Sequence, residues 1–330
     1  ALSQLIELGG KRSKRERVAA IEKDLAGWDY EAKRLDVLTE VARGFAEVLG
    51  AQQQVAYTGE LVSLAETSTR TVSERVDAGK VSPLEATKAG VSLSNTRIDA
   101  QQAKSNLVAA RKKLAALWDD PIPAFERAEG DLEVLTPVPS TENMKNLLSN
   151  NPDLARWVKE TEQRTAALEV ERAKRIPDLT VSGGVRHFSD TDDGAFVLGV
   201  SIPIPIFDRN QGGVREARYR LAKAKQEART AEAKAGSSFA ESYQTLAFSY
   251  EQAMAIKSQV LPAAEHSFAA AGEGYREGKF DFLELLDAQR TLFEAKGKYL
   301  ESLMSYHKAK ADVERLIGDS LENINKTDVK

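Results

Sequence analysis

The stretch Val76-Asp-Ala-Gly-Lys80 in the first half of the chain recurs as Tyr275-Arg-Glu-Gly-Lys279 in the second half, 199 residues later. A Leu-Glu pair follows each copy, at Leu84-Glu85 and at Leu283-Glu284. The same register links Leu117 with Leu316 and Asp120 with Asp319, and a register of 198 residues links Ser3 with Ser201, Ile6 with Ile204 and Phe45 with Tyr243. Because internal similarity at a fixed spacing indicates duplication, the chain is predicted to be two tandem units, residues 1–150 and 151–330.

Each quoted stretch predicts a sharp turn between two long helices. Gly79 and Gly278 supply the left-handed conformation that ends a helix. The predicted outgoing helices cover about 12–77 and about 210–277, and the predicted return helices cover about 82–118 and about 281–317. Good helix formers dominate the outgoing segments, and Pro262, their only proline, predicts a kink. A helix of about 65 residues measures roughly 100 Å, which is longer than a compact domain needs.

Apolar residues recur along these helices at the spacing of a coiled coil. The first outgoing helix carries Val18, Ile21, Leu25, Trp28, Ala32 and Leu35. After a break in the heptad spacing, the series resumes with Leu38, Ala42, Phe45, Leu49, Gln52 and Ala56. Its return helix carries Leu84, Val91, Ile98, Leu107, Leu114 and Leu117, and the second outgoing helix carries Leu221, Ala224, Ala228, Ala231 and Ala235. These series predict that the helices pack as coiled-coil hairpins.

The second unit begins with a predicted helix over 151–175 and a predicted β-hairpin over 178–206. Pro152 suits the first helical turn, and Pro177 ends the helix. Alternating segments then flank the polar turn Ser189–Gly194, and residues 196 to 204 place apolar side chains on one face. The first unit opens on a partial strand, 1–8, so we expect N-terminal truncation, with a leader and the counterpart of Asn151–Phe196 absent. A proline-rich equatorial connector, 119–150, and a C-terminal tail after residue 317 complete the predicted units.

Composition excludes several functional classes. The chain has no cysteine, so it forms no disulfide and no thiolate metal site. Its net charge of -4, with basic residues spread along the chain, argues against nucleic-acid binding. No apolar run approaches the roughly 18 residues of a membrane-spanning helix. His187, His266 and His307 lie far apart without ligand spacing, so no metal site or cofactor is predicted. No cluster of acid, base and nucleophile supports an enzyme.

Three segments resemble the TolC family of outer-membrane efflux proteins, and the resemblance extends over nearly the whole chain. Leu2–Arg12 and Val200–Gly212 are similar to the strand-to-helix junctions of its CzcC-type heavy-metal (cobalt-zinc-cadmium) branch. Tyr275–Arg290 is similar to the periplasmic tip of the family. The resemblance implies a mainly α fold with a small β part, in which long coiled-coil hairpins join strands of a membrane β-barrel that is shared within a homotrimer.

The resemblance also implies a function, a location and partners. We expect a passive exit duct in the outer membrane of a Gram-negative bacterium, with helices projecting into the periplasm. The expected partners are a periplasmic adaptor (membrane fusion) protein, an inner-membrane RND-type pump and outer-membrane lipid. The expected cargo is heavy-metal cations, while drugs, organic solutes or polypeptides remain open because the pump selects the cargo. A periplasmic coiled-coil adaptor is the alternative of another class, but adaptors carry one helical hairpin rather than two.

Three acidic residues are candidates for the periplasmic gate. The resemblance implies that Glu85, Glu284 and Asp287 face the channel axis and form acidic rings that favour cation passage. Glu284 and Asp287 share one helix face. The alternative is that all three are solvated carboxylates. Lys88 matches Asp287 in the repeat, which argues against two complete rings.

The turns between the helices are candidates for contact with other proteins. The resemblance implies that Tyr275 latches neighbouring helices shut, whereas ordinary packing between helices is the alternative. The predicted contact points for the adaptor are Asp77, Gly79, Lys80, Gly278 and Lys279. The alternative is that these residues form simple helical turns.

Overall fold

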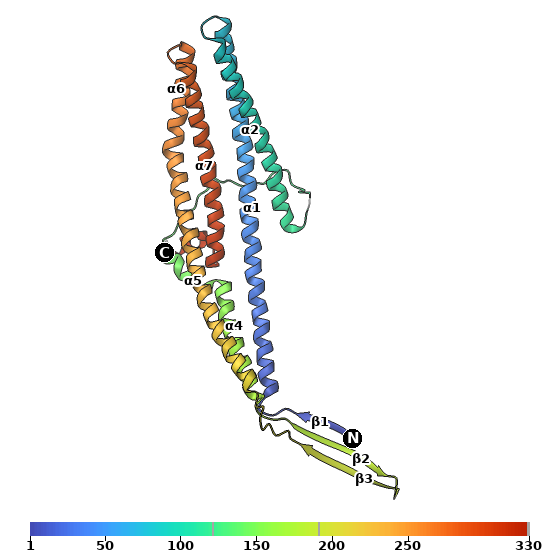
Figure 1. Ribbon diagram of the computed structural model, residues 1–330. Coiled ribbons are helices and arrows are strands. Elements are labelled where there is room, and N and C mark those ends of the chain that lie inside the picture. Colours follow the sequence, from blue (N-terminus) through green and yellow to red (C-terminus); the bar gives the residue numbers. More distant parts are fainter. Residues whose placement is uncertain (121, 191, 329–330) are drawn as a thin grey trace. The chain divides into compact units, whose positions relative to one another are not determined.

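The computed structural model describes residues 1–120, 122–190 and 192–328, and it is mainly helical with one small sheet (Figure 1). The elements are β1 (Leu2–Ile6), α1 (Lys11–Asp77), α2 (Pro83–Ala115), α3 (Thr141–Leu147), α4 (Pro152–Ala173), β2 (Leu179–Phe188), β3 (Asp193–Ser201), α5 (Gln211–Ala255), α6 (Leu261–Glu277), α7 (Phe282–Ile317) and α8 (Leu321–Asp328). The predicted class, mainly α with a small β part, is confirmed. Pro121 of the predicted connector, Thr191 of the predicted turn and the last two residues of the predicted tail lie outside the described residues.

The chain packs as two compact units. One comprises Ala1–Arg34 and Ser149–Gly236, and the other comprises Leu35–Leu148 and Ser237–Lys330. We call them the sheet unit and the hairpin unit. The two compact units differ from the two sequence repeats, because α1 and α5 each contribute residues to both compact units. The repeat boundary after residue 150 therefore stays a prediction from the sequence.

The sheet unit contains three antiparallel strands in the order β1-β2-β3. Leu2 pairs with Gly183 across β1 and β2, and Phe188 pairs with Asp193 across β2 and β3. The predicted hairpin is present, but β3 ends at Ser201, so Ile202 and Ile204 lie beyond the strand in which we expected them. Pro203 and Pro205 explain the early end, since proline has no amide hydrogen for a strand ladder.

Helices of the sheet unit pack as their apolar spacing predicted. In α1, Ile21, Leu25 and Ala32 of the predicted series are buried. Leu168 of α4 forms a small core with Val214 and Ala217 of α5. The Asn151 side chain caps α4 by accepting hydrogen bonds from the amides of Asp153 and Leu154, at 2.8 and 3.3 Å. This cap sets the start of α4, and α4 ends two residues before the predicted position of 175.

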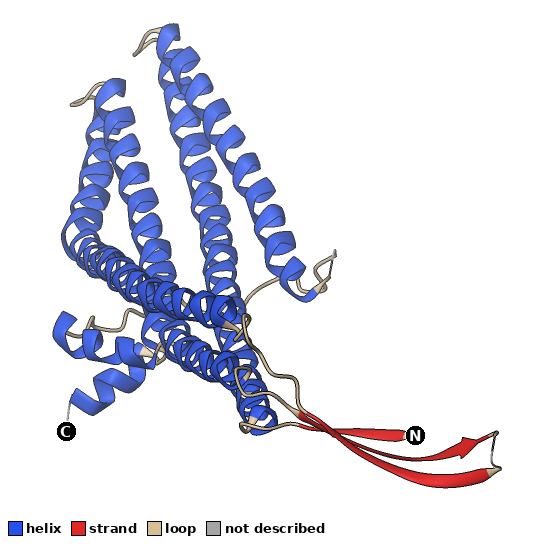
Figure 2. Ribbon diagram, turned by 60° about the horizontal axis from the view of Figure 1, so that its bottom comes forward, coloured by secondary structure: helices blue, strands red, loops and turns tan. Residues whose placement is uncertain are grey.

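The hairpin unit contains two helical hairpins, in which α2 lies beside α1 and α7 beside α6 (Figures 1 and 2). The predicted seam of α2 is wrong in its first half, because Leu84, Val91 and Ile98 are 59%, 57% and 65% exposed. A second series with the same spacing, Ala89, Thr96 and Ala103, is buried instead. Small side chains let two helices approach closely, which leaves the larger series on the outside. The resumed series of α1 fails similarly at Leu38, Ala42, Phe45 and Ala56, which are exposed.

The predicted kink at Pro262 takes the form of a π-helical turn. Residues Ile256–Val260 form this turn between α5 and α6, so the predicted helix over 210–277 is two helices. Pro262 lacks an amide hydrogen, and its ring would clash with the carbonyl group four residues earlier. A wider turn relieves both problems, which explains why the interruption directly precedes the proline.

Two segments predicted to be irregular are more ordered than expected. The connector contains α3 and is fixed to the helices by side chains: Gln52 exchanges two hydrogen bonds with the backbone of Ala128, at 2.7 and 3.0 Å, and Tyr306 exchanges two with Thr136, at 2.7 and 2.9 Å. The predicted tail forms α8, whose Leu321 is fully buried. Among the residues that the structure describes, no helix combines the length and the hydropathy that a membrane span requires.

Candidate functional site: the tips of the two helical hairpins

The tip between α1 and α2 is a compact turn with a defined cap at each side. Gly79 adopts a φ of 69°, and its amide donates to the carbonyl group of Val76 at 2.8 Å. The Lys80 amide donates to the carbonyl group of Arg75 at 2.9 Å, which completes a Schellman-type helix end. Ser82 then caps α2. Asp77, Gly79 and Lys80 are exposed, as residues that contact another protein must be.

The tip between α6 and α7 is built in the same way. Gly278 has a φ of 76°, and the Lys279 amide donates to the carbonyl group of Gly274 at 2.8 Å. Asp281 and Glu284 form a capping box, in which each side chain accepts a hydrogen bond from the amide of the other residue, at 2.9 and 3.0 Å. The Gly-Lys turns predicted from the repeat are thus present in both hairpins, and Gly278 and Lys279 are exposed.

Tyr275 connects the two hairpins. Its side chain is 1% exposed and packs against Phe282, with ring centroids 5.8 Å apart. Its hydroxyl donates to Oε2 of Glu85 on α2 at 3.1 Å. The guanidinium group of Arg75 on α1 lies 4.3 Å from the centre of the tyrosine ring and donates to the Tyr275 carbonyl oxygen. A single tyrosine of α6 therefore binds both helices of the other hairpin.

The Tyr275 phenol is a hydrogen-bond donor at every physiological pH. Burial, and then its hydrogen bond to Glu85, raises the pKa of Tyr275 to about 12. Both effects penalise the phenolate, because it would be desolvated and would face a carboxylate. The contact between the hairpins therefore does not depend on the protonation of Tyr275 between pH 5 and 10.

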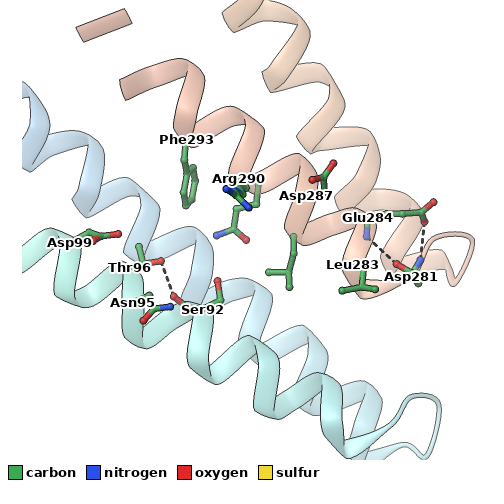
Figure 3. Close-up of a pocket in the computed structure, with 12 residues that line it drawn as sticks. Ser92, Asn95, Thr96, Asp99, Asp281, Leu283, Glu284, Asp287, Arg290 and Phe293 are labelled. Carbon is green, nitrogen blue, oxygen red and sulfur yellow. Dashed lines mark hydrogen bonds between the residues drawn. The ribbon is translucent and has the colours of Figure 1, made fainter. Parts of the chain in front are cut away.

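Glu284 and Asp287 line an open groove of about 870 Å³ between α2 and α7 (Figure 3). Both side chains are exposed and come from the first turns of α7. The opposite wall contains Ser92, Asn95, Thr96 and Asp99 of α2. Glu284 has a local structural role in the capping box, whereas Glu85 binds Tyr275. The two glutamates that the repeat makes equivalent thus have different partners.

Sequence analysis missed Arg75. The 199-residue register aligns Arg75 with Gly274, so this difference between the two sequence repeats was the signal that could have identified Arg75. Gly274 makes room for the turn, since a Cβ atom there would displace the Phe280 ring. The glycine lets α6 pass close to its own turn, and Arg75 of the other hairpin reaches across to Tyr275.

The histidines do not form a shared site. Nε2 of His307 lies 2.9 Å from the carbonyl oxygen of Leu132, and His187 lies 3.6 Å from Asp192. Within the described part of the chain, no three His, Cys, Asp or Glu side chains gather as metal ligands would.

Comparisons with known proteins agree with this architecture. The profile of the family described as outer membrane efflux protein matches residues 1–119 and 143–319. The cobalt-zinc-cadmium resistance protein CzcC of Cupriavidus metallidurans is 37% identical over 313 residues, which cover 95% of this chain and 75% of CzcC. The nickel-cobalt-cadmium resistance protein NccC of Alcaligenes xylosoxydans is 26% identical over 68% of this chain, and the match spans about half, 51%, of NccC.

A solved structure shares the fold. A crystal structure of CusC, from work on folding and transmembrane channel formation, superposes with a TM-score of 0.85. The superposition covers 96% of this chain and 76% of CusC at 18% sequence identity. The likeness shows that the described residues have the fold of a TolC-like outer-membrane channel.

Proposed function

The chain belongs to the outer membrane efflux protein family, and on this premise we propose that it is one subunit of the passive exit duct of a tripartite efflux system. Members of this family are outer-membrane efflux channels of Gram-negative bacteria rather than enzymes, and the chain is a TolC-like member. A periplasmic adaptor, the alternative of another class, does not fit this membership. The helical hairpins extend into the periplasm in this proposal.

The geometry of the hairpin tips is the observation that carries the proposal. A duct that opens only on demand needs a contact that is specific and weak enough to break. The Tyr275–Glu85 hydrogen bond, supported by Arg75, is such a contact between two separately capped hairpins. Glu284 and Asp287 lie in the adjoining groove, where their exposed carboxylates attract cations. We therefore assign Tyr275, Glu85, Glu284 and Asp287 to the periplasmic gate.

Exposed surfaces of the hairpin unit support contacts with further subunits. The turn residues Asp77, Gly79, Lys80, Gly278 and Lys279 are exposed and form the surface for the adaptor protein. The series of Leu84, Val91 and Ile98 repeats every seven residues on the outer face of α2, and no residue that the structure describes covers it. Such a series fits the side of another long helix, which a neighbouring copy in a homotrimer supplies.

The names of the relatives and the charge of the groove support a metal cargo. CzcC is a cobalt-zinc-cadmium resistance protein and NccC a nickel-cobalt-cadmium resistance protein. We infer that this chain exports heavy-metal cations that an inner-membrane pump and an adaptor deliver. The acidic residues Asp99, Glu284 and Asp287 in the groove attract cations without enclosing one, and weak binding favours passage.

Metal tolerance in cells tests this function. A bacterium that lacks its own metal-efflux channel would produce the full-length protein with its pump and adaptor, and growth would be measured in cobalt, zinc and cadmium. We expect restored tolerance to these metals and no change in tolerance to a hydrophobic drug. Restored drug tolerance alone would assign a different cargo, and tolerance to neither, with the protein present in the outer membrane, would refute the duct.

A further inference from the structure

The sheet unit contains a junction at which three segments meet, residues 7–17, 171–178 and 208–220. The Lys11 ammonium group and the Leu8 amide both bind Oδ1 of Asp178, at 2.6 and 3.0 Å. The Asn210 side chain donates to the carboxylate and to the carbonyl oxygen of Glu171, at 2.7 and 2.9 Å. These contacts hold the N-terminal ends of α1 and α5 and the C-terminal end of α4 together, where the strands leave the helices (Figure 2).

The junction is strongly basic in a chain that is acidic overall. Its three segments contain 12 lysines and arginines against six aspartates and glutamates, while the whole chain has a net charge of -4. Positive charge is unfavourable at a helix N-terminus, where the helix dipole already places positive charge. Neither α1 nor α5 has an acidic residue in its first turn. Helix stability therefore does not explain the positive charge at the starts of α1 and α5.

Some of the cations at the junction have no anionic partner. Lys14 and Arg17 of α1, and Arg215 and Arg218 of α5, form no ion pair among the described residues, and the three arginines are exposed. The 198-residue register aligns Arg17 with Arg215, so both halves of the duplicated sequence place a cation without an ion-pair partner at the same position. Repeated, unpaired charge against a helix dipole indicates an external anionic partner.

The sheet next to the junction is apolar and uncovered. Phe196 and Leu198 of β3 are 89% and 87% exposed, and Phe207, in the loop after β3, is 90% exposed and lies two residues before Arg209. An exposed apolar face of this extent marks an interaction surface. Apolar side chains that are followed within a few residues by lysine and arginine match the order of a lipid leaflet, in which acyl chains adjoin charged headgroups. A nucleic acid would match the charge but not the adjoining apolar face.

We propose that the junction binds the anionic headgroups of phospholipids in the membrane leaflet that faces the helices. Lys14, Arg17, Arg215 and Arg218 contact the phosphate groups, and the exposed face of the sheet contacts the acyl chains. The inference rests on the proposed location in the outer membrane and adds a named lipid class to it. The headgroups fix the depth at which the helices leave the membrane, because a cation that moves into the acyl region loses its hydration.

Lipid binding by the full-length protein tests the proposal. Purified protein in a neutral detergent would be titrated with fluorescent phosphatidylglycerol and, separately, with phosphatidylcholine. We expect tighter binding of phosphatidylglycerol that weakens at high salt. A variant with Lys14→Gln, Arg17→Gln, Arg215→Gln and Arg218→Gln should lose affinity on the order of 600-fold, since each of the four cations contributes about fivefold near an anionic surface.

A matched variant distinguishes the effect of the position of the cations on lipid affinity from the effect of net charge. Lys23→Gln, Lys33→Gln, Lys225→Gln and Arg229→Gln remove the same charge from exposed positions of the same two helices, farther from the sheet, and should change the affinity less than about threefold. A third variant, with Arg17→Lys, Arg215→Lys and Arg218→Lys, keeps the charge and should bind as the unaltered protein does.

Three results would overturn the proposal: equal binding of the two lipids by the unaltered protein, equal loss in the junction variant and the matched variant, or no loss in the junction variant. The first comparison needs no substitution, so it decides even if a variant misfolds. Single-channel currents recorded from the same samples test the duct separately. Currents without lipid preference would refute only the headgroup site, whereas absence of currents from the unaltered protein would refute the duct.

Discussion

Replacing Tyr275 by phenylalanine removes one hydroxyl group and leaves the rest of the contact between the hairpins in place. The ring keeps its packing against Phe282 and its contact with the Arg75 guanidinium group, at 5.8 and 4.3 Å. Only the 3.1 Å hydrogen bond to Glu85 is lost. The substitution therefore isolates the bond that we assign to the gate.

The expected cost follows from the burial of the two partners. A hydrogen bond to a charged group contributes about 1.5–3 kcal/mol when the group would otherwise be left unsatisfied. Glu85 is only half-buried, so water can replace the phenol, and we expect a loss of about 1 kcal/mol. That loss favours the separated hairpins by about fivefold in each subunit. Tyr275→Ala should cost about 3–5 kcal/mol, because it also empties a fully buried site.

A double-mutant cycle measures this bond directly. Unfolding free energies of the full-length protein would be measured for Tyr275→Phe, Glu85→Ala and the double variant, with single-channel open probability recorded in parallel. We expect a coupling energy of about 1 kcal/mol and a higher open probability in both single variants. Since the pKa of Tyr275 is about 12, the coupling should be constant from pH 6 to 9. A coupling below about 0.3 kcal/mol, or unchanged open probability, would refute the assignment.

Three further predictions concern the tips and the connector. Glu284→Gln with Asp287→Asn should reduce cation selectivity in planar bilayers without loss of stability, because glutamine preserves the capping box, and unchanged selectivity would remove both residues from the gate. Gly278→Ala should lower stability by about 1 kcal/mol, since the φ of Gly278 is 76°, whereas Gly297→Ala in the interior of α7 should raise stability by about 0.5–1 kcal/mol. Thermal unfolding measures both effects, and equal effects would contradict the left-handed cap at Gly278. Burial lowers the pKa of His307 below 6.5, so its neutral form stabilises the fold above that pH, and this contribution is lost as the pH falls through the lowered pKa. His307→Gln should therefore flatten the fall in melting temperature between pH 7 and 5. An equally steep fall would argue against this role of His307.

Sequence alone located the long helices because their ends depend on local chemistry. Glycine in the left-handed conformation, a capping side chain and proline in the first turn act within a few residues, so the start of α4 and both Gly-Lys turns were predictable. Pro262 predicted a kink but not its form, since the sequence does not specify that the helix adopts a π-helical turn. The helix α8 was missed because its eight residues are shorter than the window in which helical spacing is recognised, although Leu321 and Ile324 are buried three residues apart.

The buried faces were harder to predict, for a physical reason. Two series with the same seven-residue spacing lie on α2, one of large side chains that includes Val91 and one of small side chains that includes Thr96. Periodicity shows that a face is apolar but does not show whether its partner belongs to the same chain. Sequence analysis assigned the large series to the hairpin, and the structure buries the small one. No described residue covers the large series, and we propose that it packs against a neighbouring copy.

The candidate gate lies where the two units of the duplicated sequence differ. A strict repeat would give each tip the same glutamate in the same role, and Glu85 and Glu284 do occupy equivalent positions. The aspartate cap of α7 draws Glu284 into a capping box, whereas the equivalent cap of α2 is a serine, whose hydroxyl oxygen accepts from the Leu84 amide at 3.2 Å. Glu85 therefore binds the tyrosine of the other hairpin. Duplication supplies two similar tips, and divergence at Arg75, Ser82 and Tyr275 gives them the contacts that we propose hold the periplasmic gate closed.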